Sequence, residues 1–382
     1  MSAYSNGDPD VCQVESRRDR NAFVRLPWRI YRRDPAWVPP LLYERKQFID
    51  RRKHPFYLHG DAALFIARRG REVVGRILAG DDPRYNQQHG TNVGTFGMFE
   101  CLDDEQAAHA LLDAAGSWLI GRGRDAIMGP VDYSTNYAAG LLIEGFEHPQ
   151  RVMMNHNPPY YAHLLESWGL AKVRDLCCWQ ADRFTDDTAR WVDRAKSLLS
   201  RVSITVRPVR RNDWQAEMDR CKAIYHEAWQ DNWGFVRMTD AEFHHYAKVL
   251  LRFGVAELML LAEADGRAVG FSLLLPDINE AIRPLNGRLT RFGLPLGLFR
   301  LGRELKRVRS VRYMILGVIP DYRRRGVSEL LLIRTVDAAL RRSFSAVEIG
   351  WVLEDNRRLY GQLERVGFDR HKTYRVYEKS LA

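Results

Sequence analysis

The chain has 382 residues, of which 46% are hydrophobic and 28% are charged. This length fits two domains or one large one, and the composition is that of a soluble globular protein, which excludes disordered, collagen-like and disulfide-stapled chains. The formal net charge of +10 at pH 7 favours an anionic partner: nucleic acid, a phosphorylated cofactor or a membrane surface.

The positive charge is concentrated in one segment. Residues 204–382 carry 31 basic and 22 acidic residues, a net of +9, so the first 203 residues are almost neutral. Within the second half, residues 283–312 hold nine basic residues and one acid. The excess of positive charge therefore belongs to one basic segment and is not a general bias of the chain.

Cysteine usage and the lack of long apolar runs indicate the compartment. None of the five cysteines forms a C-x-x-C pair, so we expect free thiols in a reducing cytoplasm. The N-terminus lacks the apolar stretch of a signal peptide, and no run of about 18 apolar residues is present, so we expect no membrane-spanning segment. The histidines lack zinc-site spacing, so we expect no catalytic metal.

The predicted elements of the first half begin after a polar N-terminus. Residues 1–22 are expected to be flexible, and an aromatic, proline-rich stretch over 23–42 reads as an extended arm. Alternating apolar residues around Arg69-Gly70-Arg71 predict a β-hairpin. The later elements are a strand over 95–101, a helix over 103–120, a strand over 126–128, a helix over 157–168 and a strand over 174–181.

The second half repeats this order after a connecting helix. A strand over 204–209 and a helix over 214–229 precede a hairpin with its turn at Asp265-Gly266. The remaining predicted elements are strands over 313–318, 346–351 and 373–378, with helices over 326–342 and 356–366. The repeated order predicts two related α/β lobes. Their predicted bounds are 23–185 and 204–382, with the connecting helix at 186–203 and a basic apolar insertion at 283–312.

The strand that ends near residue 318 leads into a turn suited to a phosphate group. Pro320 stops the strand, and Gly326 allows close approach of the backbone to a ligand. The first amides of the following helix are free donors that suit a pyrophosphate. This segment resembles the acyl-CoA site of the Gcn5-related N-acetyltransferase (GNAT) superfamily, whose pattern Gln/Arg-x-x-Gly-x-Gly/Ala follows a strand ending in Val-x-Pro. Ser328 departs from the usual small apolar residue.

A second signature lies downstream, at Asn356 to Phe368, and resembles the superfamily pattern Asn-x-x-x-x-x-Tyr-x-x-x-Gly-Phe with looser spacing. Asn356 and Tyr360 are four residues apart and share a helix face. The resemblance implies that Asn356 contacts pantetheine and that Tyr360 is the general acid for the departing thiolate; the alternative for Tyr360 is a core aromatic. The implied acyl-CoA contacts are Leu316, Gly317, Val318, Arg323, Arg324, Arg325, Gly326, Val327, Ser328 and Asn356.

The first lobe shows the architecture without the site. Asp103-Asp104-Glu105 stands at the helix start, where acids would repel a pyrophosphate, so we expect only the second lobe to bind acyl-CoA. An echo of the second signature is present, since Asn157 precedes Tyr161 by four residues. We predict that Tyr133, Asn136 and Asn157 line an acceptor cleft, and structural turns are the alternative for each.

Longer strings narrow the resemblance to the tandem-lobe bacterial ceramide synthase-like GNAT family. They include Gly129-Pro130, Asn157-Pro158-Pro159-Tyr160-Tyr161 and Glu348-x-Gly350-Trp351-x-Leu353-Glu354-x-Asn356. The resemblance covers nearly the whole chain. It implies the fold class α/β, with two tandem GNAT-like lobes, each a mixed, mostly antiparallel sheet flanked by helices. It also implies transfer of a long-chain fatty acyl group from acyl-CoA to the amine of sphinganine or 3-oxosphinganine.

Direct attack requires a neutral amine, so a base must remove its proton. Glu348 on the strand and Glu354 past its end are the candidates, chosen by position. The amide of Val318 can donate to the thioester carbonyl as it gains charge. Trp351 is expected to flank the acceptor.

The basic insertion has the composition of an interfacial segment. Within 291–309, apolar residues lie beside clustered Arg and Lys with little acid, as in segments that bind anionic lipid. We expect peripheral contact with the inner membrane; the alternative is an amphipathic helix packed on the body. Nucleic acid is not expected, because aromatic residues are not interleaved with the charges.

Three other functions remain open on sequence grounds. The first is N-acetyl transfer from acetyl-CoA to a small-molecule or protein amine. The second is a non-catalytic acyl-CoA or membrane-binding module, against which the intact Arg323–Ser328 motif and Tyr360 argue. The third is aminoacyl-tRNA-dependent transfer, against which the preserved CoA motif argues.

Overall fold

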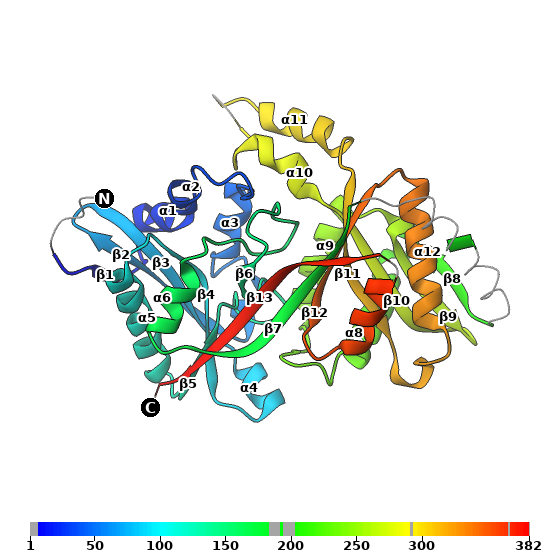
Figure 1. Cartoon of the computed structure of the whole chain (residues 1–382), viewed down its shortest axis with the longest axis horizontal. Coiled ribbons are helices and arrows are strands. Elements are labelled where there is room, and N and C mark those ends of the chain that lie inside the picture. Colours follow the sequence, from blue (N-terminus) through cyan, green and yellow to red (C-terminus); the bar gives the residue numbers. More distant parts are fainter. Residues whose placement is uncertain (1–6, 183–191, 194–202, 291–292, 366, 382) are drawn as a thin grey trace. The chain divides into compact units, whose positions relative to one another are not determined.

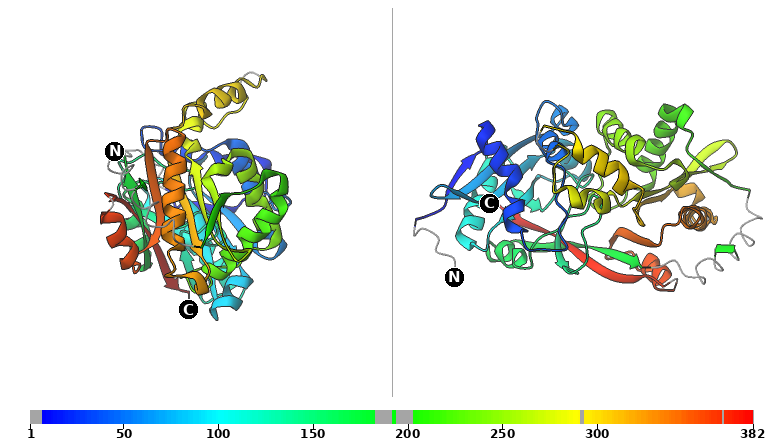
Figure 2. Two further views of the ribbon diagram at one scale, coloured as in Figure 1. Left: turned by 90° about the vertical axis from the view of Figure 1, so that its right-hand side faces the viewer. Right: turned by 90° about the horizontal axis from the view of Figure 1, so that it is seen from above.

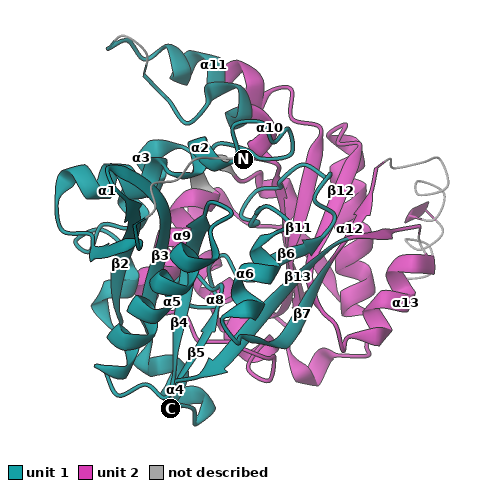
Figure 3. Ribbon diagram, turned by 60° about the vertical axis from the view of Figure 1, so that its left-hand side comes forward, with its two compact units in different colours: residues 1–177, 282–301, 372–382 teal, residues 178–281, 302–371 magenta. Residues whose placement is uncertain are grey.

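The computed structural model describes residues 7–182, 192–193, 203–290, 293–365 and 367–381. The chain forms two compact units (Figure 3). Unit 1 consists of residues 1–177, 282–301 and 372–382, and unit 2 of residues 178–281 and 302–371. Each unit therefore contains segments from both halves of the sequence.

The sheet of unit 1 is built on the predicted hairpin. Strands β2 (Asp61–Arg69) and β3 (Glu72–Asp81) pair along their whole length, and the turn uses Gly70 at φ 60°. Strand β4 (Val93–Cys101) is antiparallel to β3 but parallel to β5 (Ala126–Gly129). Helix α5 (Glu105–Ile120) packs on β2 and β3 through a fully buried apolar face.

Unit 2 repeats this arrangement (Figure 1). Strand β8 (Thr205–Pro208) borders β9 (Met259–Ala264), which forms a hairpin with β10 (Arg267–Pro276). Strand β11 (Ser310–Val318) is antiparallel to β10 and parallel to β12 (Ala346–Leu353). Helix α12 (Val327–Arg341) packs on β9, β10 and β11 (Figure 2), and α8 (Trp214–Ala228) contacts β10 and β11. The predicted fold class is confirmed.

Each unit contains strand residues from the opposite half of the sequence. In unit 1, β13 (Asp369–Ser380) pairs with β5 and with β6 (Leu141–Glu144), although it is the last strand of the chain. In unit 2, β12 has as its neighbour β7 (Ala171–Ala181), which belongs to the first half of the sequence and whose residues 178–181 fall in this unit. We call this arrangement the strand exchange.

The N-terminal region differs from the expectation. Strand β1 (Asp10–Gln13) pairs with β2, and α1 (Arg17–Arg25) begins within the segment predicted to be flexible. The aromatic arm is not extended throughout, because α2 (Pro27–Ile30) continues from α1. An edge strand needs only backbone hydrogen bonds, and Ser16 caps α1 by accepting from the Asp19 amide, so neither feature requires a long apolar pattern.

The remaining helices were only partly predicted. Helix α6 (Tyr161–Ser167) starts four residues later than expected, because Pro158 and Pro159 disfavour a helix before it. The predicted connecting helix lies almost wholly outside the described residues. The other helices are α3 (Leu42–Phe48), α4 (Pro83–His89), α9 (Asp240–Phe253), α10 (Ile278–Ile282), α11 (Leu296–Leu305) and α13 (Arg357–Arg365).

Two features that would indicate a different function are absent from the described residues. Across the described residues, no helix has both the length and the apolar character needed to cross a bilayer. The same part of the chain contains no cluster of three His, Cys, Asp or Glu side chains that could hold a metal ion.

Candidate active site

The carboxyl ends of β11 and β12 diverge. The two strands pair from Ser310 opposite Ala346 to Tyr313 opposite Ile349. Both continue beyond the last pair, β11 to Val318 and β12 to Leu353. Backbone groups on the β12 side of β11 are therefore left without a strand partner over its last residues.

The amide of Val318 is one of these groups. The Ile319 amide donates to the carbonyl of Val269 at 3.0 Å, and Val318 lies opposite Gly270 in the β10–β11 ladder. Because hydrogen-bonded and non-hydrogen-bonded pairs alternate in an antiparallel ladder, the Val318 amide points away from β10. It faces the side of β11 on which β12 has diverged, where a ligand carbonyl could accept from it.

The loop that follows β11 presents a row of backbone donors. Arg324 and Gly326 have φ values of 64° and 79°, and no side chain caps α12. The amides of residues 324–328 donate to no acceptor in the part of the chain that the structure describes. Unpaired amides at a helix N-terminus, with the partial positive charge of the helix dipole, bind phosphate groups well.

The three arginines of the motif have different surroundings. The Arg323 guanidinium donates to the carbonyl of Val318 at 3.3 Å and to that of Ala228, at the end of α8, at 2.8 Å. Arg325 lies over the ring of Tyr322, 4.9 Å from its centroid, and both Arg324 and Arg325 are exposed. Arg323 thus holds the loop in place, which leaves Arg324 and Arg325 as the cations available to an anion.

The other predicted acyl-CoA residues lie on β11 and α12. Gly317 is covered by the ring of Trp229, which leaves no room for a Cβ atom. Val327 is buried in the core, whereas Leu316 and Ser328 are half-buried. Their backbone groups, rather than their side chains, are therefore the parts that a cofactor could contact.

Helix α13 carries the predicted catalytic tyrosine. Tyr360 is 8% exposed, and its ring meets that of Trp179 edge-to-face with 5.0 Å between centroids. Asn356 is exposed, and its Oδ1 accepts from the Leu359 amide at 3.3 Å, so it caps α13. Trp179 comes from β7 and was missed in the sequence, because 181 residues separate it from Tyr360.

The predicted base Glu348 is completely buried. Its Oε2 lies 3.0 Å from Nε2 of His371, and on β11 its register partner is Arg312. Arg312 donates to the carbonyl of Gly350 at 3.0 Å and lies over the ring of Trp351. Glu348 and Trp351 were predicted from the sequence, whereas His371 and Arg312, which lack a recognisable motif, were not. Glu354 is half-buried just beyond the end of β12.

Unit 1 repeats the backbone geometry of the Val318 amide. Cys101 lies opposite Gly75 as Val318 lies opposite Gly270. The next residue, Leu102, donates to the carbonyl of Val74 at 2.9 Å, as Ile319 does to Val269. Cys101 is therefore the counterpart of Val318, and its amide also points away from the neighbouring antiparallel strand.

In unit 1, the Cys101 amide has a hydrogen-bond partner within the protein. The Cys101 amide donates to the hydroxyl of Tyr161 at 2.8 Å, and that hydroxyl donates to Glu100 at 2.9 Å. Tyr31 and Arg76 complete the buried cluster around Glu100. Burial raises the pKa values of Glu100 and Tyr161. The position equivalent to a ligand carbonyl is thus filled by a tyrosine that echoes Tyr360 in the sequence.

The helix that follows β4 also lacks an anion site. Asp104 caps α5 by accepting from the Ala107 amide at 3.1 Å. Its carboxylate binds Arg69, whose hydrogen bonds lower the pKa of Asp104. The donors that α12 leaves unpaired are therefore partly satisfied in α5 by a negative side chain.

The predicted acceptor residues Tyr133, Asn136 and Asn157 lie in unit 1. The Tyr133 hydroxyl donates to the carbonyl of Phe48, and the side chain of Asn157 bonds to the backbone of Leu142 in both directions. Asn136 lies in the same loop as Tyr133 and donates its amide to Ser134. These bonds give the side chains of Tyr133 and Asn157 structural roles, and an acceptor role for the three residues stays a prediction.

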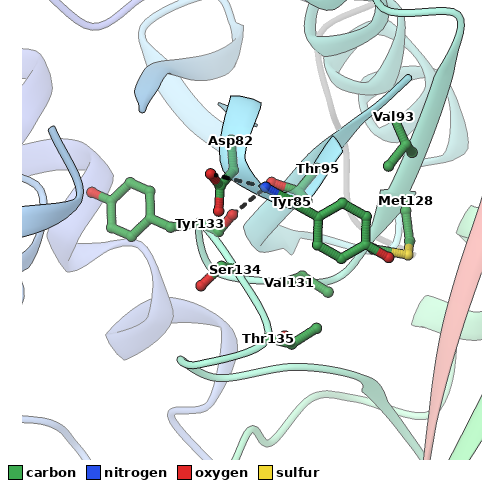
Figure 4. Close-up of a pocket in the computed structure, with 9 residues that line it drawn as sticks. All are labelled: Asp82, Tyr85, Val93, Thr95, Met128, Val131, Tyr133, Ser134 and Thr135. Atoms are coloured by element: carbon green, nitrogen blue, oxygen red, sulfur yellow. Dashed lines mark hydrogen bonds between the residues drawn. The ribbon is translucent and has the colours of Figure 1, made fainter. Parts of the chain in front are cut away.

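A pocket in unit 1 is lined in part by Tyr133. Figure 4 shows Asp82 accepting from the Tyr85 amide at one side, with Thr95 and Met128 on the strands behind. All the lining residues belong to unit 1, and none lies in the Arg323–Ser328 loop: Asp82, Tyr85, Val93, Thr95, Met128, Val131, Tyr133, Ser134 and Thr135.

Comparison with known proteins agrees with this geometry. Residues 218–368 match the acetyltransferase (GNAT) family, and this range contains β11, α12, β12 and α13. A tandem GNAT protein from the clavulanic acid biosynthesis pathway shares the fold, with a TM-score of 0.57 and 12% identity, covering 98% of this chain and 99% of that one. The chain belongs to the GNAT family and is an acyltransferase.

Two curated relatives match along the whole chain. The bacterial ceramide synthase of Caulobacter vibrioides is 36% identical over 382 residues, 99% of each chain. Protein YghO of Escherichia coli is 37% identical over 372 residues, 96% of this chain and 94% of that protein. The acyl-CoA or acetyl-CoA co-substrate and the amine acceptor follow from this family.

Proposed function

We propose that the enzyme transfers a long-chain fatty acyl group from acyl-CoA to the amine of a sphingoid base, sphinganine or 3-oxosphinganine. The acceptor class is supported by the full-length identity to a bacterial ceramide synthase. The proposed site rests on the correspondence between the strand ladders of the two units. In unit 1, a tyrosine hydroxyl accepts a hydrogen bond from the Cys101 amide, which is the counterpart of the Val318 amide.

Donor binding uses the groups that unit 2 leaves unpaired. The amides of residues 324–328 and the side chains of Arg324 and Arg325 hold the phosphates. Pantetheine runs along the unpaired edge of β11, and the thioester carbonyl accepts from the Val318 amide. The β10–β11 ladder holds the Val318 amide in place, so this amide stabilises the developing oxyanion without reorganisation.

The acyl transfer then proceeds by direct attack. The neutral amine forms a bond to the thioester carbonyl carbon, and collapse of the tetrahedral intermediate breaks the carbon–sulfur bond. Tyr360 gives its hydroxyl proton to the departing sulfur, and Glu354 or Glu348 takes the proton that the amine loses. The tyrosine is reprotonated from solvent or from the base, so the products are an amide and free CoA.

Substitution distinguishes between the two candidate bases, Glu354 and Glu348. Glu354→Gln is expected to lower kcat by about 100-fold, the range for loss of a general base, with the binding of acyl-CoA unchanged. Glu348→Gln removes the charge beside His371, so it tests the alternative base. If both variants turn over at the wild-type rate, neither carboxylate is the base.

The alternative is N-acetyl transfer from acetyl-CoA to a small-molecule or protein amine, which the name of the matched family favours. The test supplies acetyl-CoA and palmitoyl-CoA in parallel, each with and without sphinganine, and identifies products by lipid mass spectrometry. Ceramide formed from palmitoyl-CoA supports the proposal. Acetylation of a soluble amine without any lipid product would reject it.

We also propose that residues 293–309 contact an anionic membrane surface. Leu294, Leu296, Leu298 and Phe299 are exposed, Phe299 to 75%. Exposed cations follow along α11 and beyond it: Arg300, Arg303, Lys306, Arg307 and Arg309. Apolar side chains next to several cations bind anionic bilayers, at about 1 kcal/mol per basic residue. Arg291 and Phe292 of the predicted segment lie outside the described residues.

The base of this segment is anchored within unit 1. Asn286 accepts from the indole of Trp28 at 2.8 Å, and Gly287 accepts from the Leu42 amide at 3.0 Å. Trp28 also covers Gly287 closely enough to exclude a Cβ atom. The exposed apolar residues therefore extend from a fixed support.

Vesicle co-sedimentation tests the membrane contact. The full-length protein is expected to bind phosphatidylglycerol-containing vesicles at low salt, and Phe299→Asp to weaken this binding at least tenfold. Leu58→Asp is the matched control, because Leu58 is also 75% exposed but lies outside the segment. Equal binding to neutral vesicles, or an equal loss in both variants, would contradict the proposal.

A further inference from the structure

Trp179 carries a buried donor without an acceptor. The residue is 3% exposed, and its indole nitrogen makes no hydrogen bond with any of the residues that the structure describes. Buried polar groups in native proteins are nearly always paired. An exception of this kind points to a partner outside the described residues.

Trp179 lies next to the predicted catalytic tyrosine. Its ring meets Tyr360 edge-to-face with centroids 5.0 Å apart. The preceding residue, Cys178, contacts the position where Gly350 of β12 would carry a Cβ atom. Side chains of neighbouring strand residues point to opposite faces. Trp179 therefore lies with Tyr360, on the face of β7 opposite the one that Cys178 occupies.

We propose that the indole N–H of Trp179 donates to a carbonyl oxygen of bound acyl-CoA, either the thioester or the nearest pantetheine amide. This inference rests on the proposed role of Tyr360 at the thioester sulfur, because a donor packed against Tyr360 is then within reach of these oxygens. Since Trp179 reaches unit 2 through the strand exchange, the first half of the sequence supplies a substrate-binding residue to the catalytic unit.

A purely structural role makes a different prediction. An indole N–H can donate weakly to the face of an aromatic ring. If the Tyr360 ring were the acceptor, removing the N–H would lower the stability of the unliganded enzyme and leave its affinity for acyl-CoA unchanged. If a ligand oxygen is the acceptor, the same change leaves the unliganded enzyme equally or more stable and weakens its affinity.

Trp179→Phe separates these roles, because it keeps an aromatic ring and removes the donor. Calorimetry with the full-length enzyme is expected to show at least a tenfold weaker Kd for palmitoyl-CoA, with Tm of the unliganded protein unchanged or higher. Trp168→Phe is the control, since that indole donates to Asp113 in unit 1, and its Kd should stay within twofold of wild type. Titration with free CoA distinguishes the two oxygens, because only the pantetheine amide is present in it.

A spectroscopic measurement keeps the test independent of side-chain volume. The indole ¹⁵N–H resonance that disappears in Trp179→Phe should shift when palmitoyl-CoA is added to the wild-type enzyme. An unmoved resonance, a Kd within twofold of wild type, or an effect confined to the KM of the amine would overturn the proposal. Binding of acyl-CoA is measured without an amine, so a failure of the ceramide synthase assignment alone would leave this result interpretable.

Discussion

Tyr161 and Tyr360 occupy corresponding positions in the two halves of the sequence, but their surroundings differ. Tyr161 accepts from the Cys101 amide and donates to Glu100, so its hydroxyl is fully used within unit 1. Tyr360 lies on α13 beside strands that have diverged. The same residue type thus closes one site, and in the proposed mechanism it serves the other.

Substitution of the two tyrosines should separate catalysis from stability. Tyr360→Phe is expected to lower kcat by about 100-fold or more, because the thiolate loses its general acid, while the Kd for acyl-CoA changes little. Tyr161→Phe leaves the Cys101 amide without a partner and removes one of the hydrogen bonds to Glu100, so it should lower the free energy of unfolding by about 1–3 kcal/mol and retain wild-type kcat. Steady-state kinetics and denaturant titration measure both effects, and the reverse pattern would refute the assignment.

Individual residues show where sequence reasoning stops. Tyr360 and the Arg323–Ser328 loop could be proposed from the sequence because short motifs specify them locally. Trp179 and His371 were missed, because each reaches its partner only through the arrangement of strands. The burial of Glu348 beside His371 likewise depends on contacts that no spacing in the sequence reveals.

At the scale of elements, the loop before α12 should bind phosphate through charge as well as through amides. Arg325→Glu is expected to weaken the Kd for CoA at least tenfold, and added salt should reduce the difference, because exposed charges are screened. Arg334→Glu is the matched control, since Arg334 is exposed farther along the same helix. Equal losses in both variants would indicate a general charge effect and not a loop site.

Helix α8 is held to the strands by a buried carboxylate. Glu217 accepts from Arg207 of β8 at 2.7 and 2.9 Å and is fully buried. Burial by itself would raise the pKa of Glu217, but the hydrogen bonds from Arg207 and from the Arg210 amide, together with the charges of Arg207 and Arg220, lower it overall. The folded state therefore binds this proton less readily than the unfolded state does.

The pH dependence of stability follows from this difference. The contribution of Glu217 is fully present above its unfolded pKa, near 4.5, and is lost as pH falls through the lower folded value. Glu217→Gln should lower the free energy of unfolding at pH 7 by about 2 kcal/mol and flatten its decline in acid. Glu72→Gln, at an exposed ion pair with Arg29, should change it by less than about 1 kcal/mol. Denaturant titrations from pH 3 to 7 check both.

Local patterns account for the elements that were predicted well. Both hairpins, the strands beside them and the long helices α5, α8 and α12 have strong periodicity and clear turns. The short helices near the N-terminus lack such a pattern, and α9 was overlooked although Thr239 and Glu242 form a capping box. No local signal indicates that β7 and β13 complete units built mainly from the opposite half of the sequence.

At the scale of the whole molecule, the strand exchange predicts that neither half of the chain folds alone. Residues 1–190 lack the β13 strand and the 282–301 segment of unit 1, and residues 191–382 lack the end of β7. Expressed separately, the halves should be insoluble or show no cooperative thermal transition. Co-expressed, they should purify together with acyltransferase activity. A soluble, active second half on its own would contradict this expectation.

The strand exchange also bears on how such a protein can change over time. A duplicated domain without a working site is ordinarily free to be lost, since the other copy retains the activity. Here, deleting the first half would remove Trp179 and the end of β7 from the unit that holds the Arg323–Ser328 loop. Selection for the activity of one lobe therefore preserves both, even though in the first lobe a tyrosine hydroxyl bonds the amide that corresponds to that of Val318.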